Sequence, residues 1–533
     1  MSVSSLPFLH GALAAVFPKL AAWRRDFHAH PEAGWTEFRT AALIIRRLRE
    51  LGYAIRMGEA ACASDRRMGV PSSAVLAAAR ERALEHGADA ELVAGMGDGY
   101  TGFWADLDCG PGPVTAFRFD MDCNEVAECA EESHRPVREG FASRWPGLMH
   151  ACGHDGHAAV GLGLAEVLVS IRRHLRGRIR LIFQPAEEGA RGALPMSEAG
   201  AVDGVDVLFG FHIGFKAEGP GSLICGTQGF LATTKRDVLF SGVPAHAGAA
   251  PEEGKDALLA ACSAVVNLHA ISRNGKGGTR IAVGRLEGGE ARNVIPASAR
   301  LFMETRGETT ELDAYMTAES ERILRASADL WGCACEWRTV GNSAGGGSSP
   351  ELARLIATVA EAMGGWKTVI PMSGFGATED FACLMSRVQA SGGLASYLQV
   401  GTDRAAGHHS DRFDFDETCL GRALELLARL AVRMAGGGQE DTETETESDM
   451  EFLDEVVRRK GIHVQLWLEG EDGEGFGRGR VELLQLVDEL GSLSKAAKQL
   501  GMSYRGAWGK IKKAERIAGE TLVDASGTKR DGY

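Results

Sequence analysis

The sequence predicts an α/β catalytic domain interrupted by a small α+β domain and followed by a C-terminal all-α module. Apolar strands that end in polar residues alternate with helices over residues 1–228 and 342–435, which is typical of an α/β fold. Residues 229–341 follow a β-α-β-β-α-β-like order, which describes a two-layer domain inserted into the first. Residues 436–450 are acidic and rich in Gly and Thr, so we expect a flexible linker before the module at 451–533.

Length, charge and cysteine content limit the function classes. A chain of 533 residues is too long for one core, and a net charge of −14 excludes a chain built as a whole to bind polyanions. The charge is uneven, because residues 476–533 carry 11 Lys and Arg against 7 Asp and Glu, or +4, which leaves −18 for the rest. Eleven cysteines without a C-x-x-C pair favour a reduced, cytoplasmic protein.

The N-terminal elements are predicted to be helical. Residues 6–22 are apolar enough to suggest an export signal, but no basic residue precedes them, so an amphipathic helix is the better prediction. A second helix is expected over residues 36–51, and residues 58–98 have the composition of an inserted set of helices. No apolar run is long enough for a membrane span.

An apolar strand then ends in Asp120 and Asp122, whose side chains point the same way because they lie at i and i+2. A lone Asp-x-Asp is as often a solvated strand end, but a donor-rich loop follows in residues 149–157. That loop holds three histidines, a cysteine and an aspartate, which are donors for divalent metals such as zinc. A His-rich surface loop is the alternative to a metal site, and a buried helix is expected over residues 158–169.

Two further strands end in candidate groups. The strand 178–184 stops at a proline and is followed by Glu187 and Glu188. Adjacent glutamates on irregular backbone point in different directions, so one can bind a metal while the other holds the attacking water. The strand 207–211 ends at His212. Alone, these groups are typical of surface charge and a core histidine, but beside the donor-rich loop they predict one composite site.

The inserted domain and the return to the larger domain are predicted from alternating patterns. The expected strands and helices of the insert are strands 234–241, 279–286 and 299–305 and helices 257–271 and 311–330. The Gly/Ser run 342–349 is a linker back to the larger domain. That domain then includes a helix at 351–363, the pair His408-His409 and a final helix to about Met434.

The last stretch predicts three short helices, at 481–490, 494–500 and 503–518, with a turn at Gly501 that is typical of a helix-turn-helix. Basic and aromatic side chains there are candidates for contact with phosphates and base edges. A three-helix packing unit with no DNA role is the alternative. The candidate DNA-binding residues are Ser503, Tyr504, Arg505 and Lys510.

Residues 1 to about 435 resemble the metal-dependent amidohydrolases of the aminoacylase and hippuricase type. The segments that carry the resemblance include Trp23–His28, His150–His157, Gln184–Gly189, Ala245–Gly248, Arg292–Pro296 and Phe413–Glu417. The resemblance covers nearly the whole length of that family. It implies a zinc-peptidase-like catalytic domain with an inserted ferredoxin-like domain that serves as a lid and in dimerisation.

The resemblance also implies the site residues. The implied metal ligands are Cys152, His154, Glu188, His212 and His409. Glu187 takes the general-base position, Asp122 matches a supporting carboxylate, and His246 matches a residue that steadies the oxyanion, often across a dimer. Arg292 and Asn293 match a segment that binds the substrate carboxylate.

Two assignments among neighbouring residues accompany the same resemblance. His409 is preferred to His408 because it has the family's spacing to Phe413–Glu417. His150, Asp155 and His157 are expected to support the ligands rather than bind metal.

The implied activity is cleavage of an N-acyl amino acid by two divalent metal ions, Mn or Zn. The favoured substrate is p-aminobenzoyl-glutamate, a folate breakdown product, which gives p-aminobenzoate and glutamate. Hydrolysis of hippurate or another acyl-amino acid is the alternative within this class, and a DNA-binding regulator that uses the hydrolase fold as a sensor is the alternative from another class. The implied partners are a second copy of the chain, in a homodimer, or a different but related chain.

The tail resembles the winged helix-turn-helix domain of molybdate-responsive transcription regulators, on Gly491–Lys498, Met502–Arg505 and Ala507-Trp508. The sequence ends at Tyr533, where the wing should continue, and no molybdate-binding domain follows. We therefore expect a truncated wing, with DNA as a candidate partner and no molybdate sensing. A fusion of two neighbouring reading frames is a further interpretation.

Overall fold

The computed structural model describes residues 6–435, 468–469, 475–476, 493–499, 507 and 511. The chain divides into two compact units, Met1–Phe452 and Leu453–Tyr533, and each is described by itself. Among the described residues, no helix is long and apolar enough to cross a membrane.

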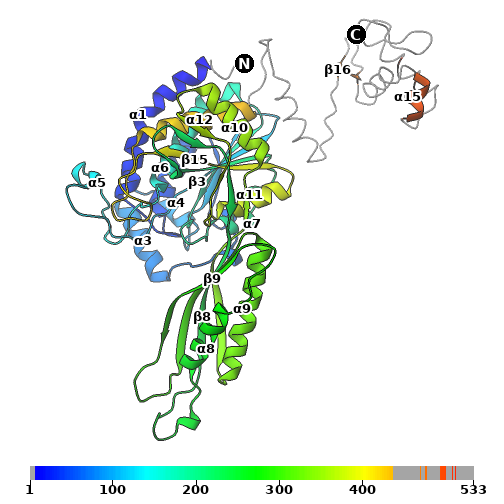
Figure 1. Cartoon of the computed structure of the whole chain (residues 1–533). Coiled ribbons are helices and arrows are strands. Elements are labelled where there is room, and N and C mark those ends of the chain that lie inside the picture. The colour runs from blue at the N-terminus through cyan, green and yellow to red at the C-terminus, as the bar shows by residue number, and fades with distance from the viewer. Residues whose placement is uncertain are drawn as a thin grey trace. The chain divides into compact units, whose positions relative to one another are not determined.

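The larger unit is built on an eight-stranded mixed sheet (Figure 1). In sheet order its strands are β1 (Ala54–Met57), β2 (Phe103–Asp108), β4 (Arg178–Gln184), β3 (Val114–Asp120), β5 (Val207–Glu218), β15 (Leu394–Thr402), β6 (Ser222–Ile224) and β13 (Thr368–Ile370). Strands β4, β3, β5 and β15 are parallel to one another. Their carboxyl ends therefore meet at one edge of the sheet, where open α/β sheets place their ligands.

Helices cover both faces of this sheet. The helices of this domain are α1 (Pro7–Ala29), α2 (Phe38–Glu50), α3 (Ser73–Glu85), α4 (Ala90–Gly95), α5 (Arg135–Arg138), α6 (His154–Ser170), α7 (Ala193–Glu198), α10 (Pro350–Met363), α11 (Phe381–Ala390) and α12 (Thr418–Ala435). Helices α1, α6 and α12 pack together on one face, and α7 and α11 pack on the other. The prediction of an α/β fold is confirmed at this level, as mixed sheets covered by helices.

The central strands are buried on both faces, which explains their nearly continuous apolar sequences. Phe119 and Phe183 point to the face covered by α6, where a Cβ at Gly161 would lie 2.7 Å from the Phe119 ring. Only glycine at this position lets the helix approach the sheet so closely. The middle of α6 is thereby held against the last residues of β3 and β4.

Short elements complete the larger domain. A three-stranded sheet is formed by β12 (Gly346–Gly347), β7 (Thr227–Phe230) and β14 (Ser373–Gly374). Single 3-10 turns occur at Gly58–Ala61, Ser64–Arg66, Arg172–His174 and Pro251–Glu253.

Residues 232–343 form a second, four-stranded antiparallel sheet, drawn in green in Figure 1. In sheet order its strands are β11 (Ala334–Ser343), β8 (Ala232–Ser241), β10 (Ser298–Gly307) and β9 (Thr279–Gly288). Helices α8 (Ala257–His269) and α9 (Thr310–Leu330) pack against it around a core that includes Phe240, Leu268, Leu301 and Leu324. The roles of this part as lid and dimer surface stay predictions.

In the smaller unit the structure describes β16 (Leu468–Glu469), β17 (Gly475–Phe476) and α15 (Leu493–Gln499). Helix α15 coincides with the second predicted helix of the tail. The acidic linker, the wing and the four candidate DNA-binding residues lie outside the described residues.

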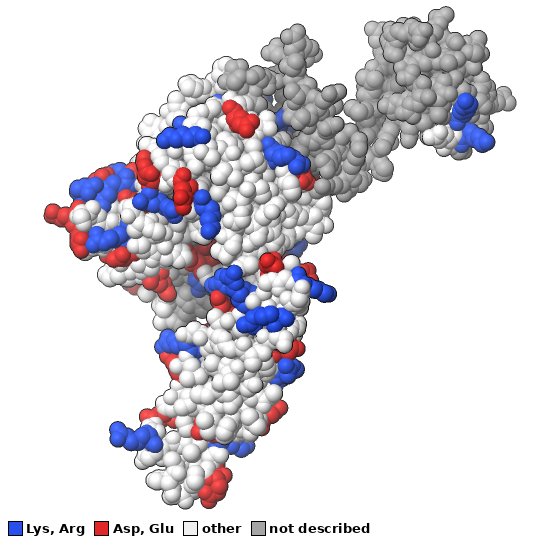
Figure 2. Space-filling model, viewed as in Figure 1, with Lys and Arg blue, Asp and Glu red and all other residues white. Residues whose placement is uncertain are grey.

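Charge is mixed on the face of the larger unit shown in Figure 2. Lys and Arg side chains lie among Asp and Glu side chains there, rather than in one large patch of a single sign. The described residues on this face therefore present no large basic patch of the kind that binds polyanions.

A buried ionic network joins the first helix to the start of α6. Arg24 is fully buried, and its Nε donates to Asp155 at 2.8 Å while its Nη2 donates to Asp414 at 2.9 Å. His28, one turn further along α1, contacts the same Asp155 oxygen at 2.8 Å. Since Asp155 follows His154 directly, the network fixes the first turn of α6.

We expect Arg24→Ala to lower the free energy of unfolding by about 3–5 kcal/mol, because the buried carboxylates would lose their guanidinium partner. The control is Arg338→Ala, which removes an equally short 2.8 Å contact with Asp237 from a side chain that is 78% exposed. That change should cost less than about 1 kcal/mol. Urea unfolding followed by circular dichroism measures both, and equal small losses would contradict the prediction.

Candidate active site

Four segments that are distant in sequence meet at the carboxyl edge of the parallel strands. Cys152 precedes α6 and His154 begins it, while Glu188 follows β4. His212 lies in β5, and His409 lies in the segment between β15 and α12. The structure therefore brings together the five residues that were predicted as metal ligands.

Cys152, His154 and His212 form one donor triad, in which one donor atom from each lies within 4.8 Å of the others. His212 Nε2 lies 3.4 Å from Cys152 Sγ, and His212 Nδ1 donates to the carbonyl of Ile213 at 2.9 Å. His154 Nδ1 donates to the carbonyl of Asp122 at 2.9 Å. Because each Nδ1 donates to backbone, each Nε2 is left as the lone-pair atom that can bind a metal.

Cys152, Glu188 and His409 form a second triad by the same distance. His409 Nε2 lies 3.2 Å from Glu188 Oε1, and the His409 amide donates to the carbonyl of Ala151 at 2.7 Å. His409 has a φ of 65°, a left-handed conformation that few residues other than glycine adopt. Cys152 belongs to both triads, so its sulfur lies between two possible ion positions.

The neighbouring His408 faces elsewhere. Its Nδ1 accepts from Arg404 at 2.9 Å, and its Nε2 donates to the carbonyl of Ile213 at 3.1 Å. Both ring nitrogens are thus occupied. His409 is the member of the pair that reaches the triads.

Asp122 holds the loop that carries the two glutamates. Its carboxylate accepts from the amides of Glu187 at 3.0 Å and Glu188 at 2.9 Å. Left-handed residues on either side, Ala186 with a φ of 49° and Ala190 with a φ of 62°, turn the loop sharply. This turn places Glu188 in the second triad, while a carboxylate oxygen of Glu187 lies within 4.8 Å of those of Glu188 and of a His154 nitrogen.

Glu187 lies beside a buried ionic network that sequence analysis missed. Its carboxylate is grouped with those of Glu379 and Asp380, again within 4.8 Å. Arg118, which is fully buried, donates to Asp120 at 2.6 Å and to Glu379 at 3.0 Å. The signal in the sequence was the single arginine inside the otherwise apolar strand that precedes Asp120.

The predicted supporting residues have different surroundings. His157 Nδ1 donates to Asp120 at 2.6 Å, and its Nε2 accepts from the amide of Ile213 at 2.9 Å, so neither nitrogen is free for a metal. Asp155 is bound in the network around Arg24. His150 is buried, and in the described part of the chain neither ring nitrogen has a hydrogen-bond partner.

Neighbouring groups at the triads raise the pKa values of two of the donor histidines. Hydrogen bonds to Cys152 and Glu188 raise the pKa of His409 to about 10. Although burial opposes it, the carboxylate of Asp120 raises the pKa of His154 well above its usual value. A divalent cation at the triads would interact with the same anionic neighbours and would favour the neutral form of both histidines, which is the form that binds metal.

The donor set fits metal ions. His154 Nε2 is buried, has no hydrogen-bond partner among the residues described, and lies 3.7 Å from Asp120 Oδ2. An unpaired buried nitrogen costs free energy unless a ligand engages it. Sulfur, imidazole and carboxylate donors together suit zinc and related first-row divalent ions.

The residues predicted in the inserted domain lie near one another. The amide of Ala247, next to His246, donates to the carbonyl of Asn293 at 3.0 Å, and His246 forms a β-bridge with Val294. The side chains of His246, Arg292 and Asn293 are exposed. Within the described ranges, no hydrogen bond or ion pair joins them to either triad, so the structure does not bring these three to the metal donors.

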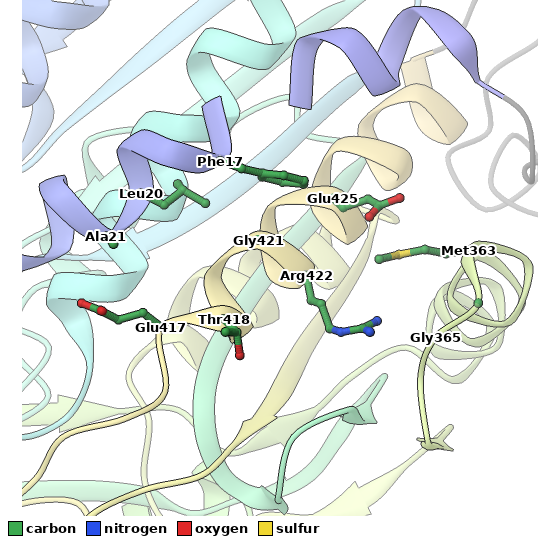
Figure 3. A pocket seen from close by; sticks show the side chains of 11 residues that line it. Phe17, Leu20, Ala21, Met363, Gly365, Glu417, Thr418, Gly421, Arg422 and Glu425 are labelled. Carbon is green, nitrogen blue, oxygen red and sulfur yellow. The ribbon is translucent and has the colours of Figure 1, made fainter. Parts of the chain in front are cut away.

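A separate pocket of about 550 Å³ lies where α1, α10 and α12 meet (Figure 3). Its lining includes Phe17, Leu20, Met363 and Arg422. None of the predicted site residues that the structure describes lines it. The candidate site is therefore the pair of triads.

Residues 116–433 match the sequence profile of peptidase family M20/M25/M40. The chain belongs to this family. Indole-3-acetyl-aspartic acid hydrolase of Enterobacter agglomerans is 44% identical to it, over 80% of this chain and 98% of that one. A p-aminobenzoyl-glutamate hydrolase subunit of Escherichia coli strain K12 is 46% identical, over 78% and 95%. The predicted class of the enzyme is confirmed, because members of the M20 family hydrolyse amide or peptide bonds with the help of metal ions.

Solved structures also show that the fold of this M20 chain is similar to that of other proteins of the family. The aminobenzoyl-glutamate utilization protein of Klebsiella pneumoniae matches with a TM-score of 0.69 and 40% identity, over 80% of this chain and 98% of that one. The YXEP protein of Bacillus subtilis, a dinuclear metal-binding peptidase of the M20 family, matches with a TM-score of 0.54 and 25% identity, over 79% and 98%. Residues 479–530 match the bacterial regulatory helix-turn-helix proteins of the lysR family, in agreement with the predicted tail.

Proposed function

We propose that this chain is a dinuclear-metal amidohydrolase that cleaves p-aminobenzoyl-glutamate to p-aminobenzoate and glutamate. The observation that carries the proposal is the pair of donor triads that share Cys152, with the carboxylate of Glu187 beside them. The similarity to the p-aminobenzoyl-glutamate hydrolase of Escherichia coli supports the choice of substrate. A similar enzyme, of Enterobacter agglomerans, is named for the hydrolysis of indole-3-acetyl-aspartic acid, which carries a different acyl group.

Two divalent ions would be held by this set. Cys152, His154 and His212 would bind one ion, and Cys152, Glu188 and His409 the other, with the thiolate between them. When bound, the ions polarise the scissile carbonyl and lower the pKa of the attacking water. The soft sulfur donor favours zinc, and manganese is the alternative.

Glu187 is the proposed general base. It would take the proton of the attacking water and pass it to the leaving amine. Burial and the neighbouring carboxylate of Glu379 raise the pKa of Glu187 well above its usual range, and the charge of bound cations would bring it down again. Asp122 supports the step by holding the Glu187 and Glu188 amides.

The inserted domain would complete the site. His246 is proposed to stabilise the developing oxyanion, and Arg292 and Asn293 to bind the substrate carboxylate. Their exposed positions, close together and apart from the triads, are consistent with delivery by lid closure or by a second chain. In a homodimer the second chain is another copy of this one. The Escherichia coli relative is named as one subunit of its hydrolase, which suggests a different but related chain instead.

A second candidate substrate is supported by the similarity to the hydrolase of Enterobacter agglomerans. Indole-3-acetyl-aspartic acid hydrolase is 44% identical to this chain, so indole-3-acetyl-aspartate is the alternative substrate. For the tail, the helix-turn-helix match supports a DNA-binding role of Ser503, Tyr504, Arg505 and Lys510.

The test uses the purified full chain loaded with zinc or with manganese. It is incubated with p-aminobenzoyl-glutamate, indole-3-acetyl-aspartate and hippurate, and the released acids are separated by chromatography. We expect the highest kcat/KM for p-aminobenzoyl-glutamate. Release of none of the acids with either metal, together with binding to DNA, would favour a regulator over an enzyme.

A further inference from the structure

Strand β5 carries a large bulge after Ile213, the residue next to His212. Its pairing with β15 runs in register to Ile213 opposite Val400 and resumes only at Glu218 opposite Thr402. Residues 214–217 therefore loop out where the partner strand has one residue. Bulges of this kind redirect side chains and are common beside active sites.

The bulge presents Phe215 in a conformation that bulky residues rarely adopt. Phe215 has a φ of 62°, next to Gly214 with a φ of 75°. A left-handed bulky residue costs free energy and persists only where its surroundings hold it. Here the ring stacks on Phe375, with centroids 4.6 Å apart and planes 21° apart.

Phe375 is a rigid support for that ring. It is only 4% exposed, and its ring also contacts those of Phe230 at 4.9 Å and Tyr397 at 6.1 Å. Phe215 itself is partly exposed. The bulge thus holds an aromatic ring at the edge of the core rather than burying it.

The Phe215 ring lies beside the donor triads. Its centroid is 5.7 Å from that of His212, at an interplanar angle of 67°, and 5.5 Å from that of His408. Both ring nitrogens of His408 are hydrogen-bonded to other groups, so His408 contacts Phe215 through its ring atoms and not through a free polar nitrogen. The surroundings of Phe215 are therefore aromatic on the side of His212.

We propose that Phe215, backed by Phe375, forms the acyl subsite and sets a preference for amides of planar aromatic acids over those of non-planar acids. This inference rests on the proposed hydrolase function and specifies its substrate class. A second ring can stack on or meet the edge of Phe215 at centroid distances of about 4.5–7 Å. The carboxylates of an acidic amino acid would be poorly solvated against these rings, so the amino-acid side of the substrate lies elsewhere.

The test compares two amides of glutamate that differ only in the acyl ring, benzoyl and cyclohexanecarbonyl. The rings are similar in size, but only benzoyl is planar and aromatic. We expect Phe215→Leu to lower the ratio of kcat/KM for benzoyl over cyclohexanecarbonyl by about two- to tenfold, the range of one aromatic contact. Phe215→Trp should keep the preference, because it retains an aromatic face.

Phe17→Leu is the matched control, since Phe17 is an exposed phenylalanine of α1 outside the site. Its ratio should equal that of the wild type. The inference is overturned if Phe215→Leu leaves the ratio unchanged, or lowers both rates equally while Phe215→Trp fails to restore the preference. A wild type that cleaves neither amide overturns the proposed function itself, whereas a wild type that cleaves both equally overturns only this inference.

Discussion

Replacing Glu187 with glutamine is expected to lower kcat by about 10²- to 10⁴-fold, the usual contribution of a general base. An amide of the same shape cannot accept the proton of the attacking water. The loop should keep its form, because Asp122 holds the backbone amide of residue 187 and not its side chain. Glu187 belongs to neither triad that shares Cys152, but its carboxylate also lies within 4.8 Å of donor atoms of His154 and Glu188. An unchanged metal content is therefore the result expected for a base, and it separates that role from the role of a ligand.

Glu188→Gln is the informative comparison, because Glu188 lies in the second triad, 3.2 Å from His409. That variant should lose activity together with part of the bound metal. Steady-state kinetics and elemental analysis on the same preparations separate the two outcomes. Loss of metal from Glu187→Gln would make Glu187 a ligand instead of a base, and a kcat within about tenfold of the wild type would place the base elsewhere.

The bounds of the strands could be predicted closely, because a strand's own apolar residues and the proline or polar residues that follow it determine where it begins and ends. Strand β4 was expected at residues 178–184 and occupies Arg178–Gln184, since a proline ends its apolar run. Helix α6 was expected to begin at residue 158 and begins at His154. Its first turn is polar, and its burial depends on partners such as Arg24 that only the folded chain brings near.

The metal-donor residues of the site could be predicted from local motifs, but their arrangement in space could not be predicted in this way. Arg118 and Glu379 are 261 residues apart, and neither local sequence indicates that the two side chains form an ion pair. The choice of His409 over His408 rested on resemblance, and its physical reason is the contact of His408 with Ile213. Similarly, the bulge at Phe215 follows from a pairing mismatch with β15 that a single strand does not reveal.

Replacing Cys152 with alanine is expected to have the widest effect on metal binding, because Cys152 is the donor that both triads share. Loss of groups that merely orient ligands costs about 10- to 100-fold in metal affinity, and loss of a shared donor should exceed that at both positions. His212→Ala and His409→Ala each remove a donor from one triad only. They should leave about one ion bound per chain, whereas Cys152→Ala should leave nearly none.

Elemental analysis after dialysis against a defined free metal concentration measures these contents, and activity is assayed in parallel. Cys419→Ala is the control, since Cys419 is a buried cysteine of α12 outside both triads. If Cys152→Ala retains two ions, the sulfur is not shared and the two triads are not one centre.

Cys152→Asp tests the nature of the shared donor. A carboxylate keeps the negative charge that a position between two cations requires, but it is a harder donor than a thiolate. We therefore expect this variant to recover part of the metal binding that Cys152→Ala loses, with manganese favoured over zinc relative to the wild type. Recovery with zinc alone would contradict the assignment, because it would mean that the sulfur does not set the metal preference of the site.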